Sequence, residues 1–286
     1  MISLSLAPPG ATAPAAELPA VAALSMYDWP ELQAANDALW TAVAERLAAA
    51  GARDVPQALT RGDDLHAVWT SPALVLAQTC GYPLLKTLAG QVQLVATPRY
   101  RALGCEGPFR RSAIVVGAQA RTGSLAALRG GRCALNDRMS DSGMNLLRAA
   151  VAPLADAKPF FSQVVMTGSH LASAEAVAAG EADVAAIDAV TFAHLQRLRP
   201  MVARRLRVIQ WTARTPGLPL ITAVTTDPTI RLALQQALSD VARDAQLAWV
   251  RDILLLDGFT PLPMNYYRLT QHLEDRAQAL GYPSLQ

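Results

Sequence analysis

Residues 133–151 contain a short apolar strand that leads directly into a helix. The strand covers residues 133–135, and Met144 and Leu147 then begin a run of apolar residues at the three- and four-residue spacing of a helix face. The turn between them supplies two hydroxyl groups and three backbone N–H groups, from Ser140, Ser142, Gly143, Met144 and Asn145. Because the first turn of a helix leaves N–H groups unpaired and carries partial positive charge, this turn is a candidate anion site. An ordinary helix cap without a ligand is the alternative.

Two further strands end in the same way. Residues 164–166 form an apolar strand, which is followed by Ser169 and His170 and then by a helix. Residues 184–187 form another apolar strand, which ends at Asp188 before a further helix. The carboxyl ends of parallel strands meet at one edge of an α/β sheet, where ligands bind. We therefore expect Ser169, His170 and Asp188 to share one site with the serine-rich turn.

The first part of the chain adds candidates from two other strand ends. Tyr27 follows an apolar strand, so its ring can face the site, and packing beneath the next helix is the alternative. The strand at residues 74–77 runs into a turn that contains the candidates Thr79, Gly81 and Tyr82. A plain turn without a binding role is the alternative there. Residues 55–60 are also predicted to form a strand.

Four segments together resemble the PhnD-like phosphate/phosphonate substrate-binding proteins of ABC transporters. They are QTCGYPL, ATPRYRALGCEGPFRRSAIVV, NDRMSDSG and GSHLASAEAVAAGEADVAAID. The resemblance covers the chain from about residue 22 to about residue 258. It implies the α/β type 2 periplasmic binding protein fold, in which two lobes are joined by two crossing strands. Each lobe of that fold is expected to be a mostly parallel sheet flanked by helices.

The same resemblance implies where the lobes begin and end. Residues 21–110 and 213–286 would form the first lobe and residues 111–212 the second, with a hinge near residues 97–113 and 207–214. Residues 1–20 contain several prolines and no basic residue, so we expect a disordered leader rather than a secretory signal. The family implies a periplasmic location, and a cytoplasmic location stays open as the alternative.

One residue departs from the pattern of the family. Phosphonate-binding proteins commonly show Ser-Thr-Ser-Gly at the serine-rich turn, whereas this chain has Asp141 in the second position. A carboxylate opposes an anionic ligand unless it points away or meets a cation. The loop at residues 98–111 could supply that cation, and it contains Arg99, Arg101, Arg110 and Arg111.

The residues favour a binding protein without catalysis, which closes its lobes around a small polar anion. Phosphate, phosphonate or another oxyanion would suit the serine-rich turn, and Asp188 would accept a hydrogen bond from an amine or hydroxyl of the ligand. The resemblance implies that the permease of an ABC transporter is its partner, and we expect a monomer without a cofactor. The net charge of +2 gives no support for a nucleic-acid partner.

Two other functions stay open at this point. Ser142, His170 and Asp188 are the residue types of a hydrolytic triad, so a cytosolic enzyme on the same fold is one alternative, and a metabolite sensor is another. No G-x-S-x-G elbow surrounds Ser142. The three cysteines contain no C-x-x-C pair and predict no metal site. Cys80 and Cys105 are equally compatible with a disulfide and with free thiols.

Overall fold

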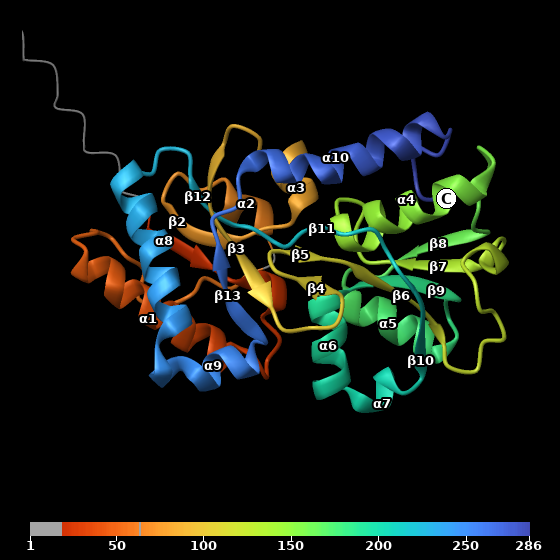
Figure 1. Cartoon of the computed structure of the whole chain (residues 1–286), viewed down its shortest axis with the longest axis horizontal. Helices are drawn as coiled ribbons and strands as arrows, with labels where there is room; N and C mark the ends of the chain where they lie inside the picture. Colours follow the sequence, from red (N-terminus) through yellow and green to blue (C-terminus); the bar gives the residue numbers. More distant parts are fainter. Residues whose placement is uncertain (1–18, 63) are drawn as a thin grey trace, which may run out of the picture.

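The computed structural model describes residues 19–62 and 64–286. It shows two lobes side by side, each built around a five-stranded sheet with helices against it (Figure 1). The two-lobed α/β fold predicted from the sequence is therefore confirmed. Residues 1–18, which hold most of the predicted leader, lie outside the described residues. None of the helices in the described ranges is long and apolar enough to cross a membrane.

The sheet of the first lobe has the strand order β1-β2-β12-β3-β13. Its strands are β1 (Val21–Ala23), β2 (Leu74–Gln78), β3 (Val92–Tyr100), β12 (Leu220–Ala223) and β13 (Leu256–Thr260). Strands β1 and β2 run parallel, whereas β12 and β13 run antiparallel to their neighbours. Residues 55–60, all of which are described, form no strand, so that prediction is wrong. Pro56 has no N–H to give to a sheet, and Thr60 N donates a lone backbone hydrogen bond to Ala22 O of β1 instead of forming a ladder.

The sheet of the second lobe has the strand order β10-β6-β9-β7-β8. Its strands are β6 (Ser112–Gly117), β7 (Arg132–Leu135), β8 (Gln163–Met166), β9 (Val184–Asp188) and β10 (Leu206–Trp211). Strand β7 runs parallel to β8 and β9, whereas β6 runs antiparallel to β9 and β10. Both sheets are therefore mixed rather than mostly parallel, because the strands that follow a crossing, β6 and β12, run against their neighbours.

Two segments cross between the lobes, residues 101–111 from β3 to β6 and residues 212–219 from β10 to β12. They form a small sheet with the order β11-β5-β4, made of β4 (Cys105–Glu106), β5 (Phe109–Arg110) and β11 (Thr215–Pro216). In this sheet Arg110 pairs with Cys105 on one side and Thr215 on the other. We propose that this small sheet is the hinge and that the lobes divide within it.

Helices cover both faces of each sheet. Those of the first lobe are α1 (Gln33–Ala49), α2 (Leu65–Trp69), α3 (Gly81–Lys86), α8 (Pro228–Arg243) and α9 (Ala248–Ile253). Those of the second are α4 (Leu146–Ala155), α5 (His170–Ala179), α6 (Ala189–Leu198) and α7 (Pro200–Ala203). The short turns are η1 (Ser25–Tyr27), η2 (Ala126–Leu128), η3 (Asp141–Asn145) and η4 (Ala245–Leu247).

The strands of the second lobe bury alternate residues in two separate cores. Ile114 and Val116 of β6 pack with the residues of α4, whereas Ala113 and Val115 of the same strand pack with those of α5 and α6. This is the alternation expected when a strand is covered on both faces. The ends of these strands are thereby fixed in position between two layers of helices.

The C-terminal helix α10 (Met264–Ala279) contacts both lobes, as its long course in Figure 1 shows. Near its start, Tyr267 packs in a core of the first lobe. Beyond its middle, Ala277 and then Tyr282 and Leu285 pack in a core of the second lobe. The prediction that residues 213–286 belong to the first lobe alone is therefore wrong for this end of the chain. A helix of 16 residues is about 24 Å long, which is enough to reach from one lobe to the other.

Candidate functional site

A cavity of about 740 Å³ lies between the lobes, and residues at the predicted strand ends line it. Its polar and charged lining includes Tyr27, Asp28, Asp64, His66, Asn136, Asp137, Ser140, Ser142, Ser169, His170, Asp188 and Thr191. Six of these are residues that the sequence predicts for the site. This volume lies within the range of small-molecule pockets. A second, apolar cavity of about 30 Å³ behind Tyr27 has room for little more than a water molecule.

The serine-rich turn is folded back on its first residue. Its residues 141–145 form a single π-helical turn that continues into α4, and Ser140 is the N-cap. Ser140 Oγ accepts a hydrogen bond from Gly143 N at 2.9 Å. The carbonyl oxygen of Ser140 accepts from Met144 N at 3.3 Å and from Asn145 N at 3.1 Å. The three backbone N–H groups that were predicted to hold an anion are therefore already paired, because the π-helical turn directs them at Ser140.

Gly143 allows two side chains to approach this turn closely. A Cβ atom at Gly143 would lie 1.7 Å from Asn136 Oδ1 and 3.2 Å from His170 Cε1, so only glycine fits. Asn136 lines the cavity and was missed by the sequence analysis. The signal that could have found it is the Asn136-Asp137 pair directly after the strand that leads into the serine-rich turn.

Ser142 and His170 form a neutral hydrogen-bonded pair at the cavity. Ser142 Oγ lies 2.7 Å from His170 Nε2 and 3.3 Å from Ser140 Oγ. Burial lowers the pKa of His170 to about 4, so the imidazole is neutral near pH 7. Ser169 caps α5, with its Oγ accepting a hydrogen bond from Ala172 N at 3.0 Å. The second lobe thus presents hydroxyl and imidazole groups without a positive charge.

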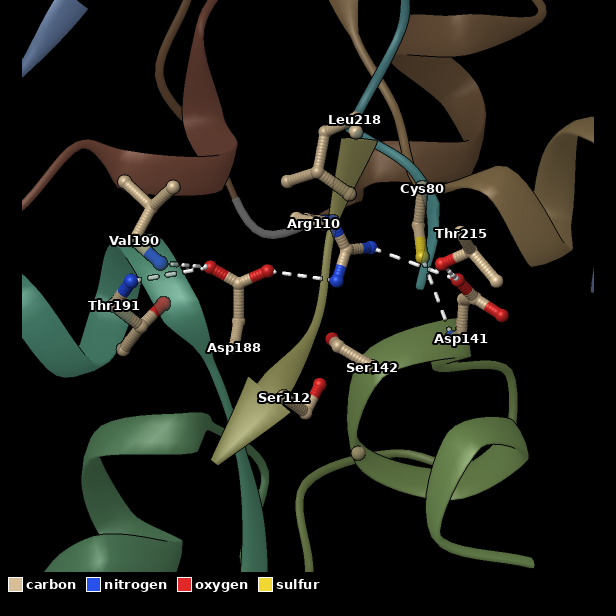
Figure 2. A network of polar contacts seen from close by, with 12 residues as sticks. Cys80, Arg110, Ser112, Asp141, Ser142, Asp188, Val190, Thr191, Thr215 and Leu218 are labelled. Atoms are coloured by element: carbon tan, nitrogen blue, oxygen red, sulfur yellow. Dashed lines mark hydrogen bonds and ion pairs between the residues drawn. The ribbon is translucent and has the colours of Figure 1, made fainter. Parts of the chain in front are cut away.

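Asp188 is held by groups of the protein itself (Figure 2). Its Oδ1 accepts hydrogen bonds from Tyr27 Oη at 2.9 Å, Val190 N at 2.9 Å and Thr191 N at 3.1 Å. Burial and, after it, the Asp188 carboxylate raise the pKa of Tyr27 well above its ordinary value, so the phenol stays protonated. The predicted role of Asp188 as acceptor for a ligand amine does not fit this arrangement. Asp188 instead connects the second lobe to Tyr27 of the first.

Arg110 is the cation that the sequence analysis sought in the loop at residues 98–111. Its Nη1 lies 2.8 Å from Asp188 Oδ2 and its Nη2 lies 3.7 Å from Asp141 Oδ2. Figure 2 shows the guanidinium between these two carboxylates. These contacts are ion pairs, since no N–H of Arg110 is aligned for a hydrogen bond to a described residue. Burial opposes the guanidinium charge, but Asp188, Tyr27 and Asp141 together raise the pKa of Arg110 above its ordinary value.

Asp141 points away from the cavity toward the hinge sheet. Its Oδ2 accepts a hydrogen bond from Thr215 Oγ1 at 2.8 Å, and its Oδ1 accepts from Asn145 Nδ2 at 3.0 Å. Its N–H lies 3.4 Å from the sulfur of Cys80, which belongs to the first lobe. A carboxylate in this turn is compatible with an anionic ligand if it points away from the ligand or lies beside a cation, and Asp141 does both. The side chain faces away from the ligand space, and a cation lies beside it.

Several predicted site residues face α10 or a core rather than the cavity. Tyr82 Oη donates to Glu274 Oε1 at 2.7 Å, and Gly81 lies under the ring of Tyr267. Asn145 Nδ2 donates to Thr270 O at 3.1 Å. The residues of the prediction that do not line the cavity are Thr79, Gly81, Tyr82, Gly143, Met144 and Asn145. Gly81 and Tyr82 lie against α10, whereas Cys80 and Pro83 of the same turn reach the cavity.

Ser142, His170 and Asp188 are not arranged as the triad of a serine hydrolase. Asp188 makes its hydrogen bonds to Tyr27, Val190 and Thr191, whereas His170 Nδ1 is buried without a partner among the described residues. A triad requires the acid to orient this nitrogen. Cys80 and Cys105 are both free thiols, so the disulfide alternative is wrong.

The cavity carries negative rather than positive charge at its lining. Its charged residues are Asp28, Asp64, Asp137 and Asp188, and no lysine or arginine is among the described residues that line it. Asp28 is paired with Arg61 at 2.6 Å. The exposed Asp137 accepts a hydrogen bond from Met139 N at 2.6 Å.

The fold and the cavity between its lobes define a two-lobed solute-binding protein. Residues 73–267, more than half of the 286, match the family described as ABC transporter, phosphonate, periplasmic substrate-binding protein. The chain therefore belongs to this family of substrate-binding proteins, and the resemblance seen in its sequence motifs is confirmed.

Solved structures with this fold cover nearly the whole chain. A binding protein component of an ABC phosphonate transporter from Pseudomonas aeruginosa has a TM-score of 0.73 and 18% identity, over 92% of this chain and 88% of that chain. PhnD1 from Prochlorococcus marinus, in complex with methylphosphonate, has a TM-score of 0.71 and 13% identity, over 90% and 97%. XAC2383 from Xanthomonas citri, bound to ATP, has a TM-score of 0.68 and 20% identity, over 91% and 97%. A comparison with curated protein sequences gives no match.

Proposed function

We propose that this protein captures a small phosphonate-type anion that also carries an amine, in the cavity between its lobes. In this proposal it delivers the ligand, as a monomer without catalysis, to the permease of an ABC transporter outside the cytoplasmic membrane. The observation that carries the proposal is that Ser140, Ser142, Ser169 and His170 of the second lobe line the same cavity as Tyr27 of the first. Contacts from both lobes are what allows a ligand to favour a closed state.

The anionic end of the ligand would bind at Ser140, Ser142 and His170. The hydroxyl groups are donors, and a neutral imidazole offers one N–H. Hydrogen bonds from such groups to an ionised ligand contribute about 1.5–3 kcal/mol each. Asp141 does not oppose the anion by contact, because it faces Thr215 rather than the cavity.

The amine is inferred from the carboxylates at the cavity lining. Asp28, Asp141 and Asp188 are occupied by protein groups, so the remaining acceptor positions are those of Asp64 and Asp137. Asp137 is exposed and directly follows Asn136 at the anion end. A ligand with a positive charge a few atoms from its phosphonate group would contact both the hydroxyl and imidazole donors at the anion end and these carboxylates.

Isothermal titration calorimetry tests this function. The panel contains 2-aminoethylphosphonate, ethylphosphonate and 2-aminoethanesulfonate, titrated into the wild-type protein and into Ser142→Ala. We expect both amine-bearing ligands to bind more tightly than ethylphosphonate, and Ser142→Ala to weaken their binding by about 10- to 100-fold, as loss of one hydrogen bond to an anion predicts. The control is Ser162→Ala, because Ser162 is exposed and its hydroxyl donates only to Gly131 O. Absence of binding by the wild-type protein across the panel would refute the proposal.

A further inference from the structure

Asp141 lies between the two serines that line the cavity, yet it belongs to a buried charge network beneath them. It is completely buried, and its two oxygens accept hydrogen bonds from Thr215 and Asn145. Both bonds come from donors, which is the pattern of an ionised carboxylate. The turn that presents Ser140 and Ser142 to a ligand therefore carries a fixed negative charge on its far side.

The network beneath the turn has more negative than positive groups. Arg110 lies 2.8 Å from Asp188 but 3.7 Å from Asp141, so one guanidinium serves two carboxylates. Among the other titratable groups nearby, His170, Tyr27 and Cys80 are neutral near pH 7. Burial lowers the pKa of His170 to about 4, and it raises the pKa values of Tyr27 and Cys80. Beyond Asn145, Arg148 lies 3.6 Å from Glu274, which also pairs with the partly exposed Lys86. The formal charges of Asp141, Asp188 and Arg110 sum to −1, and no lysine or arginine among the described cavity-lining residues offsets this sum.

We propose that Asp141 is a specificity-determining residue whose charge makes this site discriminate against dianions and favour ligands that carry a single negative charge at the anion end. The inference rests on the proposed function, because it concerns the same site. Each negative charge of a ligand is repelled by the uncompensated charge of the network, so a dianion is repelled twice. At the effective dielectric constant of a partly buried site, one such repulsion corresponds to on the order of a tenfold loss of affinity.

Two ligands of the same tetrahedral shape separate charge from size. Methanesulfonate carries one negative charge, and methylphosphonate carries two at a pH above its second ionisation. Both are titrated by calorimetry at that pH into the wild-type protein and into Asp141→Asn. The amide keeps the shape of the side chain and an oxygen for the Thr215 hydroxyl, while it removes the charge. We expect methanesulfonate to bind on the order of tenfold more tightly to the variant, and methylphosphonate on the order of a hundredfold.

The matched control is Asp156→Asn, which removes a carboxylate of the same lobe whose side chain is 82% exposed. Solvent screens that charge, so both affinities should stay within a factor of two of the wild type. An equal change for the two ligands in Asp141→Asn, or no change for either, would overturn the inference while leaving the proposed function intact. Failure of every ligand to bind the wild-type protein would overturn the proposed function itself.

A second measurement covers the case in which Asp141→Asn does not fold. The wild-type protein is titrated with both ligands at pH values below and above the second ionisation of methylphosphonate. We expect the affinity for methylphosphonate to fall by at least about tenfold relative to methanesulfonate. Methanesulfonate does not change its charge, so it reports any titration of the groups around Asp141. These are Arg110, Cys80 and Asp188 and, beyond Asn145, Arg148, Glu274 and Lys86. A constant ratio, or binding of dianionic methylphosphonate with no binding of methanesulfonate, contradicts the inference.

Discussion

Removing the Tyr27 hydroxyl is expected to destabilise the protein by breaking a buried hydrogen bond between the lobes. Tyr27 Oη donates to Asp188 Oδ1 at 2.9 Å, and both residues are almost completely buried. A hydrogen bond to a charged group contributes about 1.5–3 kcal/mol, so Tyr27→Phe should lower the free energy of unfolding by about that amount. We do not expect the larger loss of about 3–5 kcal/mol that follows from an uncompensated buried charge. The reason is that Arg110 and two backbone N–H groups still contact Asp188.

Equilibrium urea unfolding of the ligand-free protein measures this effect. The midpoint should move to lower urea while the slope of free energy against urea stays the same, because the phenylalanine ring buries the same apolar surface. Tyr266→Phe is the control, since Tyr266 is 43% exposed and its ring packs edge-on against Phe109. If Tyr27→Phe changes the free energy of unfolding by less than about 0.5 kcal/mol, as ordinary surface substitutions do, the hydrogen bond does not hold the lobes together.

Two further results are expected. Gly143→Ala should abolish ligand binding and lower the melting temperature, because its Cβ would overlap Asn136 Oδ1 at 1.7 Å; calorimetry and thermal unfolding check this, and retained affinity would contradict it. Burial lowers the pKa values of His170 and His194 from 6.5 to about 4 in the folded protein, so only the unfolded chain binds their protons between these values. The free energy of unfolding should therefore be fully present above pH 6.5 and fall toward pH 4, by on the order of 3 kcal/mol per histidine. Urea unfolding at a series of pH values measures this, and stability that stays constant over that range would contradict it.

The position of the candidate site could be predicted from the sequence because it follows from a general rule of sheet topology. Ser140, His170 and Asp188 each follow a strand of the second lobe, and β7, β8 and β9 run parallel to one another. Their carboxyl ends must then lie at one edge. The pattern of residues at that edge was enough to point to the cavity and to name five of the eleven second-lobe residues that line it, Ser140, Ser142, Ser169, His170 and Asp188.

The partners of those residues could not be predicted, because they come from distant parts of the chain. Tyr27 and Asp188 are 161 residues apart, and no local pattern shows that one donates to the other. The choice of Arg110 among the arginines of its loop depends on the register of β5 with β11, which two-residue strands do not encode visibly. Tyr82 was expected in the cavity, but its hydroxyl donates to Glu274 of α10. The packing of α10 over this turn is a tertiary feature that the local sequence does not show.

The prediction of free N–H groups in the serine-rich turn failed for a different reason. The rule that a helix N-terminus has free N–H groups assumes an α-helical first turn. Here a π-helical turn lies in its place, and Asn145 N reaches back to the carbonyl of Ser140. Glycine and serine residues in this stretch are compatible with either geometry, so the sequence alone does not separate them.

The bridging course of α10 has a consequence for the speed of ligand capture. Two crossing segments by themselves allow two lobes to rotate apart, but a helix that packs on both lobes must slide or detach when they do. Asn145 binds Thr270 and Tyr82 binds Glu274, so these contacts oppose separation. If ligand enters only a separated form, the small population of that form limits the association rate. The rate of uptake would then be set in part by residues that never touch the cargo.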